Sequence, residues 1–282
     1  MTPHADSSLP PRDTIPLARA QRVHRWLALA CALLCVSGVW AAEDMPSKVA
    51  PDRPTVSNST ETVPVGAVQI ELGLEYARSS VVDGPDERRL AAQATIRTGL
   101  TDRLEVRLEG EPLVRLRQEQ DDTGIGDLAL GLKYRFFDPP EGQWWPSLGV
   151  QPFVKLPVAK TPIGSERTDF GLRLLASREL PWELSLDVNA GLVAVGQPHG
   201  YLLQALASAS VSREFMGGLS PFVEVFFASR DERDGRDTLG LDAGVIYFLT
   251  RRVALDAAVE AAFRGNGPDY AFRAGFSLRM GR

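Results

Sequence analysis

Cysteine and histidine are scarce in this chain, and their positions exclude several kinds of chemistry. Of the 282 residues, 2 are cysteines, Cys31 and Cys35, and both lie in an apolar run near the N-terminus. If export removes that run, the exported protein has no disulfide and no thiolate metal site. Of the 3 histidines, His4 and His24 lie in the same N-terminal region, so His199 alone remains. Serine-based catalysis generally needs a histidine base, which makes a hydrolase a weak alternative.

The chain also lacks a second long apolar run and an excess of positive charge. Beyond the N-terminus, no segment is apolar for the roughly 18 residues that a spanning helix needs. This does not exclude a membrane β-barrel, because alternating strands dilute hydropathy. Lys and Arg number 31 against 36 Asp and Glu, a net charge of −5. Such a balance does not favour a nucleic-acid partner.

The N-terminal residues 1–41 have the pattern of a secretory signal peptide. Three arginines precede the apolar run 27–39, and small residues follow it, with cleavage expected after Ala41. The run is short for a membrane anchor, and the residues before the two cysteines do not fit a lipoprotein signal. Residues 42–66 are then polar and contain four prolines. They are either a flexible leader or a plug that folds into a lumen, and the leader is favoured because termini are commonly disordered.

A strict two-residue alternation runs from Leu128 to Phe136. Leucine and aromatic side chains occupy one face, and Ala129, Gly131, Lys133 and Arg135 occupy the other. Successive side chains of a strand point to opposite faces, so this is a strand with one apolar and one polar face. In a soluble sandwich the apolar face would form the core. In a membrane barrel the apolar face meets lipid and the polar face lines the lumen.

The same alternation recurs in about twelve segments between Ala67 and the end of the chain. Loops after odd-numbered segments are mostly longer and polar, whereas turns after even-numbered ones are mostly tight, except at 138–143. One tight corner is expected at Leu180–Pro181, with the next strand starting at Trp182. An even strand count with short turns at one end is typical of outer-membrane barrels. We therefore predict an all-β fold, a transmembrane antiparallel up-and-down β-barrel of about 12 strands, over residues 67–282. A soluble sandwich would leave the signal peptide and the loop asymmetry unexplained.

The polar faces of these strands carry charged side chains near mid-strand, and we predict that these side chains line the lumen. The candidates are Glu105, Arg107, Glu109, Asp127, Lys133, Arg135, Lys155, Arg173, Glu224, Asp242, Glu260 and Arg273. A carboxylate-based catalytic site among Glu105, Glu109, Asp127 and Glu224 is the alternative. We favour a lumen of mutually neutralising charges, because buried charges are normally paired.

Cofactor and metal motifs are weak. Gly124 and Gly126 precede an alternating strand and Gly131 lies within it, so these glycines do not open a helix and do not form a nucleotide loop. The acidic loops 118–122 and 230–237 lack calcium-loop spacing and are interpreted as solvated loops. We predict no catalytic, cofactor-binding or metal site.

Two stretches resemble the family called the MetA-pathway of phenol degradation family. Residues 52–66, followed by the strand 68–76, resemble its start, and the run Gly124-Ile-Gly-Asp-Leu-Ala-Leu-Gly-Leu-Lys-Tyr-Arg135, closed by Phe136, resembles its central signature. The resemblance implies an outer-membrane barrel that transports aromatic or other hydrophobic compounds, without catalytic residues.

The end of the chain resembles the signal that barrel-assembly machinery reads, through Arg273, Gly275, Leu278 and Met280, although such proteins usually end in Phe. The expected partners are outer-membrane lipid and lipopolysaccharide, this machinery and a small-molecule cargo.

Three functions fit these features. The leading hypothesis is a channel or transporter in the cell outer membrane for passive uptake of small hydrophobic or aromatic compounds. The second is a structural or sensory barrel with a filled lumen, and the third is an envelope hydrolase. A barrel of twelve strands lies between those filled by side chains and open porins of sixteen or more.

Overall fold

The computed structural model describes residues 48–80, 85–140, 142–265 and 267–281, so the predicted signal peptide lies outside the described residues. No helix in this part of the chain is long and apolar enough to cross a membrane. The elements are β1 (Val68–Ser79), β2 (Glu87–Thr101), β3 (Leu104–Arg117), β4 (Asp121–Gly124), β5 (Leu128–Phe137), β6 (Ser147–Leu156), β7 (Asp169–Leu180), the 3₁₀ turn η1 (Pro181–Glu183), β8 (Leu184–Gly196), β9 (Tyr201–Arg213), β10 (Leu219–Ala228), β11 (Thr238–Phe248), β12 (Val253–Arg264) and β13 (Tyr270–Met280).

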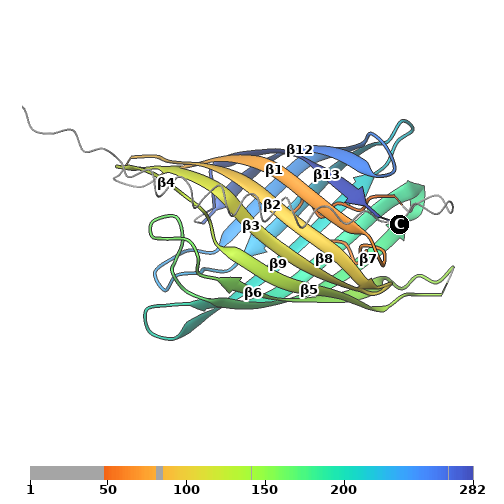
Figure 1. Cartoon of the computed structure of the whole chain (residues 1–282), viewed down its shortest axis with the longest axis horizontal. Coiled ribbons are helices and arrows are strands. Elements are labelled where there is room, and N and C mark those ends of the chain that lie inside the picture. Colours follow the sequence, from red (N-terminus) through yellow and green to blue (C-terminus); the bar gives the residue numbers. More distant parts are fainter. Residues whose placement is uncertain (1–47, 81–84, 141, 266, 282) are drawn as a thin grey trace, which may run out of the picture. The chain divides into compact units, whose positions relative to one another are not determined.

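The long strands form one closed antiparallel barrel (Figure 1). Each long strand pairs with its neighbours in the sequence, and β1 pairs with β13 from Val68 opposite Met280 to Arg78 opposite Tyr270. The short strand β4 pairs only with the end of β3 and adds nothing to the circumference. The barrel therefore has twelve strands in up-and-down order, which confirms the predicted fold class.

The alternation in the sequence determines which side of the wall each residue occupies. On β5, Leu130 and Leu132 point outward with 46% and 41% of their surface exposed, whereas Lys133 between its apolar neighbours is 0% exposed. The other long strands repeat this pattern, with exposed side chains such as Leu74, Leu174, Val223 and Phe272 on the outside. A continuous band of this kind would be an aggregation surface in water. It is the lipid-facing band of a transmembrane barrel.

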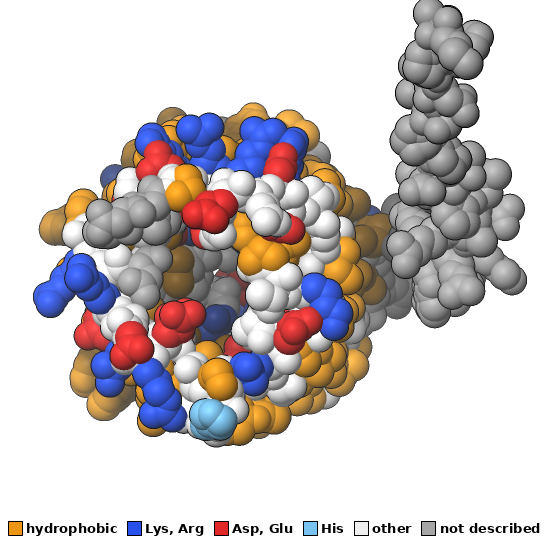
Figure 2. Space-filling view, turned by 90° about the vertical axis from the view of Figure 1, so that its left-hand side faces the viewer, with side chains coloured by type: hydrophobic (Ala, Val, Ile, Leu, Met, Phe, Trp, Pro, Cys, Tyr) orange, Lys and Arg blue, Asp and Glu red, His pale blue; other side chains and the backbone are white. Residues whose placement is uncertain are grey.

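The two ends of the barrel differ in their connections. At one end, here called the short-turn end, tight turns join β2 to β3, β7 to β8 and β11 to β12. At the other, the loop end, residues 157–168 and 229–237 form longer connections. The 138–146 connection is the longer exception at the short-turn end. Figure 2 looks at the loop end, where charged side chains of both signs surround a central hollow. The strands therefore enclose a lumen that opens at this end.

Two local expectations are wrong. Trp182 does not start a strand: it lies in η1 with φ of 66°, is 80% exposed, and β8 begins at Leu184. The left-handed conformation lets the chain reverse within three residues, which ends the alternation earlier than the pattern suggests. The stretch 118–122 is not a simple loop, because Asp121–Gly124 pairs with Val114–Arg117 and extends the hairpin beyond β3.

Candidate functional site in the barrel lumen

The polar segment 48–66, here called the inner segment, lies inside the short-turn half of the barrel. It starts at the short-turn end, where the Val49 amide donates to the Arg251 carbonyl at 2.8 Å. It returns to the same end, where the Thr62 hydroxyl donates to the Asp102 carbonyl at 2.9 Å and Val65 forms a β-bridge with Gly99. Between these points its groups bond to inward side chains of the strands. The inner segment is thus a loop of chain folded into the lumen.

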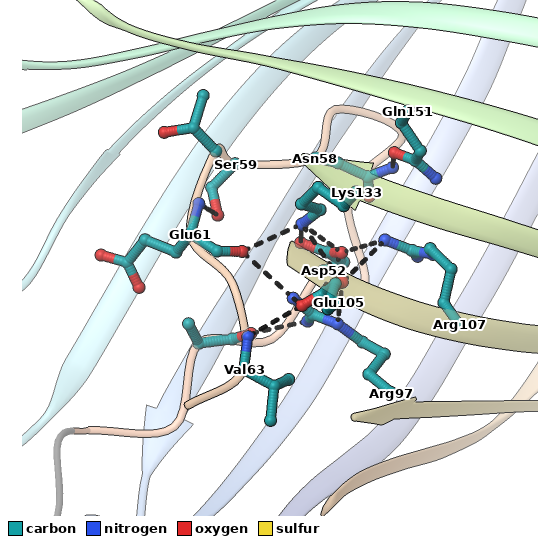
Figure 3. Close-up of polar contacts among 12 residues, drawn as sticks. Asp52, Asn58, Ser59, Glu61, Val63, Arg97, Glu105, Arg107, Lys133 and Gln151 are labelled. Atoms are coloured by element: carbon teal, nitrogen blue, oxygen red, sulfur yellow. Dashed lines mark hydrogen bonds and ion pairs between the residues drawn. The ribbon is translucent and has the colours of Figure 1, made fainter. Parts of the chain in front are cut away.

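Asp52 is the most strongly held residue of the inner segment. Its carboxylate accepts hydrogen bonds from Lys133 Nζ at 2.8 and 3.0 Å and from an Arg107 guanidinium nitrogen at 2.6 Å, and Arg97 lies at 3.4 Å. Figure 3 shows Asp52 between these three cations, here called the cationic cage. Burial raises the pKa of the Asp52 carboxyl, but Arg97, Lys133 and Arg107 outweigh burial and hold that pKa well below its ordinary value. Asp52 is therefore ionised.

Lys133 is the cation of the cage that depends most on the inner segment for its partners. Arg97 is shared between Glu105 and Glu71, each 2.9 Å away. Lys133 has its two closest acceptors on the inner segment, the Asp52 carboxylate and the Glu61 carbonyl at 3.2 Å, while Glu105 lies 4.0 Å away. Burying a charge without a partner is costly, so the segment supplies the partner that this lysine needs.

The tip of the inner segment binds the opposite wall. The amides of Val56 and Ser57 donate to the two carboxylate oxygens of Glu224 at 2.7 and 2.6 Å, and the Ser57 and Ser208 hydroxyls bond at 2.8 Å. Two successive amides that grip one carboxylate form a small anion-binding concavity. This matters because Glu224 stands opposite Asp242 in the β10–β11 register. The tip therefore stabilises a carboxylate that has another carboxylate as its neighbour.

A single arginine pairs with the rest of this acidic row. Asp242 stands opposite Glu260 in the β11–β12 register. Arg273 pairs with Asp242 at 2.9 Å, with Glu75 at 3.1 Å and also with Glu260. The row is thus held by one guanidinium together with the backbone amides of the inner segment.

Asn58 fixes the descending part of the inner segment through amide groups. Its backbone amide donates to the Asn189 side chain at 2.7 Å, and Asn189 donates back to the Asn58 carbonyl at 2.9 Å. Its side-chain amide donates to Gln151 at 2.9 Å. These buried polar groups all find partners, which is the condition for a stable polar interior.

Small wall residues make room for the inner segment. Gly73 and Gly275 face each other across β1 and β13, and a Cβ on either would lie 2.0 or 2.8 Å from the Arg53 guanidinium. A Cβ on Gly99 would lie 2.0 Å from the Val63 carbonyl oxygen. Glycine inside a strand commonly marks a place where another backbone approaches closely. The wall is therefore shaped to fit this segment.

Beyond the inner segment, on its loop-end side, lies a cavity of about 490 Å³. Asp52, Arg53 and Val56 of the segment line one side of it, and Glu111, Asp127 and Lys155 belong to the loop-end halves of the wall. Arg173 also faces the cavity, with its guanidinium 4.9 Å from the centre of the Phe153 ring. No carboxylate of the described residues lies within ion-pairing distance of Arg173.

Eleven of the twelve residues that the sequence proposed as lumen-lining fall into three groups, and Arg135 stands apart. Glu105, Arg107 and Lys133 surround Asp52, with Glu109 bonded to Arg107, and Glu224, Asp242, Glu260 and Arg273 form the acidic row with its arginine. Lys155 forms ion pairs with Asp127 at 3.1 Å and with Asp169 at 2.8 Å. Arg173 faces the cavity. Arg135 lies near the short-turn end and pairs with Asp138 at 3.2 Å, outside the cage.

Sequence reasoning missed the inner segment's own contributions and several wall residues. The missed residues include Asp52, Arg53, Asn58, Arg97, Gln151 and Asn189. Arg97 and Gln151 lie on inward faces, which the alternation could have shown. Nothing in the pattern of residues 42–66 indicates which wall groups they bind.

The geometry does not assemble a hydrolytic site in the described part of the chain. His199 is exposed in the β8–β9 loop, where its carbonyl accepts a bond from Arg233. The four candidate carboxylates are held by cations or amides, as described above. In the acidic loops, Asp121 pairs with Arg115 and Arg117, and the Asp237 carboxylate accepts from the Arg230 amide. Among the described residues no group of three or more His, Cys, Asp or Glu is arranged to hold a metal ion.

The fold and the lumen together define a transmembrane β-barrel whose polar interior is partly filled by its own N-terminal chain. Solved barrels show the same architecture. The COG4313 outer membrane channel from Pseudomonas putida F1 is 15% identical, with a TM-score of 0.63, and the match covers 80% of this chain and all of that chain. The NanC porin is 12% identical, with a TM-score of 0.50, over 76% of this chain and all of that chain. At these identities the likeness shows the fold.

The chain belongs to the family described as "Putative MetA-pathway of phenol degradation", whose profile matches residues 51–280. This confirms the resemblance seen in the sequence. The match begins at Pro51, so most of the inner segment belongs to the part of the chain that defines the family. A comparison with curated proteins finds no match.

Proposed function

We propose that this protein is a channel of the bacterial outer membrane that admits small molecules by passive diffusion, with the inner segment as its closure. The observation that carries the proposal is the cavity of about 490 Å³, which is bounded on the short-turn side by the inner segment. Its volume lies within the range of small-molecule sites. A molecule that enters from the loop end would therefore reach the inner segment before the far opening.

The family supports a cargo of small hydrophobic or aromatic compounds, because its description refers to phenol degradation. Inside the lumen, Phe153, Phe222 and Phe226 stand over Gly171, Gly244 and Gly240 of the neighbouring strands, so aromatic faces are present among the charges. A ring that carries a polar group would suit such a wall better than a pure hydrocarbon. We expect lipopolysaccharide and the barrel-assembly machinery as the partners of the folded barrel and of its C-terminal strand.

A barrel with a permanently filled lumen is the second candidate function. The density of bonds around Asp52, Ser57 and Asn58 favours it, because each bond would have to break for the inner segment to move. The two candidates differ in one respect: only a channel needs the inner segment to leave its place.

A reversible covalent lock separates the two candidates. The Ser57 and Ser208 hydroxyl oxygens are 2.8 Å apart, so S57C/S208C places two thiols at a distance that a disulfide can bridge with a small adjustment. The two native cysteines are replaced by Cys31→Ser and Cys35→Ser in all variants, so that the new thiols are the only ones. Ionic current through the purified barrel in a planar bilayer is measured before and after a reductant is added.

For a channel closed by the inner segment, we expect the oxidised variant to carry little current and the reduced variant to carry several-fold more. S57C alone is the matched control, and its current should not respond to the reductant. Equal low current in both redox states would favour the filled barrel. Equal high current would show that the inner segment does not close the lumen.

A further inference from the structure

The cationic cage is built for a carboxylate, and the protein fills it with its own. We propose that this cage is also the binding site for the carboxylate of a small-molecule ligand, which competes with Asp52 for Lys133, Arg107 and Arg97. The inference deepens the proposed function and rests on it, because the ligand would arrive as cargo. It identifies that cargo as a small organic acid.

The pairing of Lys133 carries this inference. Without Asp52, Lys133 loses both of its close acceptors, since the Glu61 carbonyl belongs to the same inner segment. The nearest wall carboxylate, Glu105, lies 4.0 Å from Lys133 and pairs more closely with Arg97, at 2.9 Å. A fully buried ammonium without a partner is strongly unfavourable. An incoming carboxylate would restore the charge-assisted bonds that Asp52 gives up.

The cavity supplies a route to the cage. Asp52 and Arg107 line both the cavity and the cage, so a ligand in the cavity is already in contact with the group that it would displace. Arg173 faces the same cavity without an ion-pair partner among the described residues. Its guanidinium lies over the Phe153 ring, which holds it in place while its polar edge stays available to an anion. A carboxylate would thus meet Arg173 first and the cage second.

If Asp52 competes with the ligand, removing its charge should raise the affinity of the barrel for benzoate. Equilibrium dialysis of the full barrel in detergent gives the affinity for benzoate, with benzamide as the uncharged probe. Asp52→Asn removes the competing charge and leaves the three cations, so benzoate should bind about tenfold more tightly than to wild type. Glu111→Gln removes a carboxylate that lines the same cavity but pairs with Arg89, outside the cage. Its affinity for benzoate should stay within about twofold of wild type.

Two double variants locate the bound carboxylate. In the Asp52→Asn background, Lys133→Gln removes a cation of the cage and should abolish the gain in benzoate affinity. Lys155→Gln removes a cavity cation that is not in the cage and should keep that gain. Heat-modifiable gel mobility confirms that each barrel is assembled, and Asp52→Ser replaces Asp52→Asn if the latter does not assemble.

Several results would overturn the proposal: equal gains in Asp52→Asn and Glu111→Gln, equal losses from the two lysine substitutions, or binding of benzamide as tight as that of benzoate. Each of these would show a general effect of lumen charge or of the aromatic ring. The experiment measures binding and not current. A barrel whose current follows the S57C/S208C lock but whose benzoate affinity ignores Asp52 keeps the channel function and loses this site; the reverse result keeps the site and loses the channel.

Discussion

The two halves of the lumen have walls of the same chemistry but different contents. In the short-turn half, the side chains of Arg97, Glu105 and Lys133 are 0% exposed beneath the inner segment. In the loop-end half, Lys155 is 24% exposed and Glu109 is 36% exposed, and they face the cavity. Both halves come from the same alternation of polar and apolar residues. What differs is whether a second layer of chain supplies partners for the inward groups.

This difference shows that the filling of the lumen depends on the inner segment and not on the wall. Charged side chains alone leave a cavity in the loop-end half, because they pair with one another along the wall, as Lys155 does with Asp127 and Asp169. In the short-turn half, the inner segment adds a carboxylate beside Lys133, two backbone amides beside Glu224 and a side-chain amide beside Gln151. Substitutions in the two halves should therefore have unequal effects.

The largest effect is expected from Lys133→Glu. The substitution would put a third carboxylate beside Asp52 and Glu105 in a buried cluster, and breaking a buried ion pair costs about 3–5 kcal/mol. We expect the barrel to assemble, because the lumen accepts polar substitutions, but the inner segment to leave its place. The yield of the S57C/S208C disulfide should fall strongly in this background, and the current of Lys133→Glu alone should rise several-fold.

Lys155→Glu is the matched change in the loop-end half. Its neighbours are also two carboxylates, but it is partly exposed, so water and salt screen the repulsion. The disulfide yield should stay close to that of the parent. Equal loss of the disulfide in both variants would show that the two halves do not differ in the way described here.

The sequence predicts the wall well because strand alternation has a physical cause that acts locally. A residue's position in a strand determines its face, and the apolar face must meet lipid. Leu130, Leu132, Lys133 and Glu224 accordingly lie on the sides that the pattern indicates. The tight turn at Trp182 is harder to predict, because a residue with a left-handed backbone conformation interrupts the alternation and no glycine marks the position.

The contents of the lumen could not be predicted in the same way. The partner of Lys133 is Asp52, 81 residues earlier, and the partner of Glu224 is a pair of backbone amides 167 and 168 residues earlier. Residues 48–66 have no period, since their bonds follow the shape of the wall and not a repeating face. A polar, proline-containing stretch predicts a disordered leader equally well. Only the wall glycines that face Arg53 and Val63 indicate in the sequence that another stretch of chain packs against the wall.

An intermediate effect is expected from Gly99→Ala. The new Cβ would lie 2.0 Å from the Val63 carbonyl oxygen, so the returning end of the inner segment must shift. Because the cage and the tip remain intact, we expect partial release, with a current above wild type but below that of Lys133→Glu. Gly124→Ala is the control, since its Cβ would meet only the end of the Ile163 side chain, at 3.0 Å, away from the cage and the inner segment. A larger current from Gly124→Ala than from Gly99→Ala would contradict this account of the close approach.

The smallest effect is expected from pH across the neutral range. Arg97, Lys133 and Arg107 hold the pKa of Asp52 well below its ordinary value of 3.8, so the bound inner segment keeps the carboxylate ionised. A lowered pKa contributes stability that is fully present above the ordinary value and is lost as the pH falls from there towards the lowered pKa. The contribution of Asp52 to closure should therefore stay constant from pH 8 to pH 5 and be lost only below about pH 4, where the wild-type current should rise. Other lumen carboxylates, including Glu105, also take up protons in acid and alter the current directly.

The oxidised S57C/S208C variant separates the two effects, because its inner segment cannot leave. A rise below about pH 4 of the same size in that locked variant would show that protonation of Asp52 does not release the inner segment.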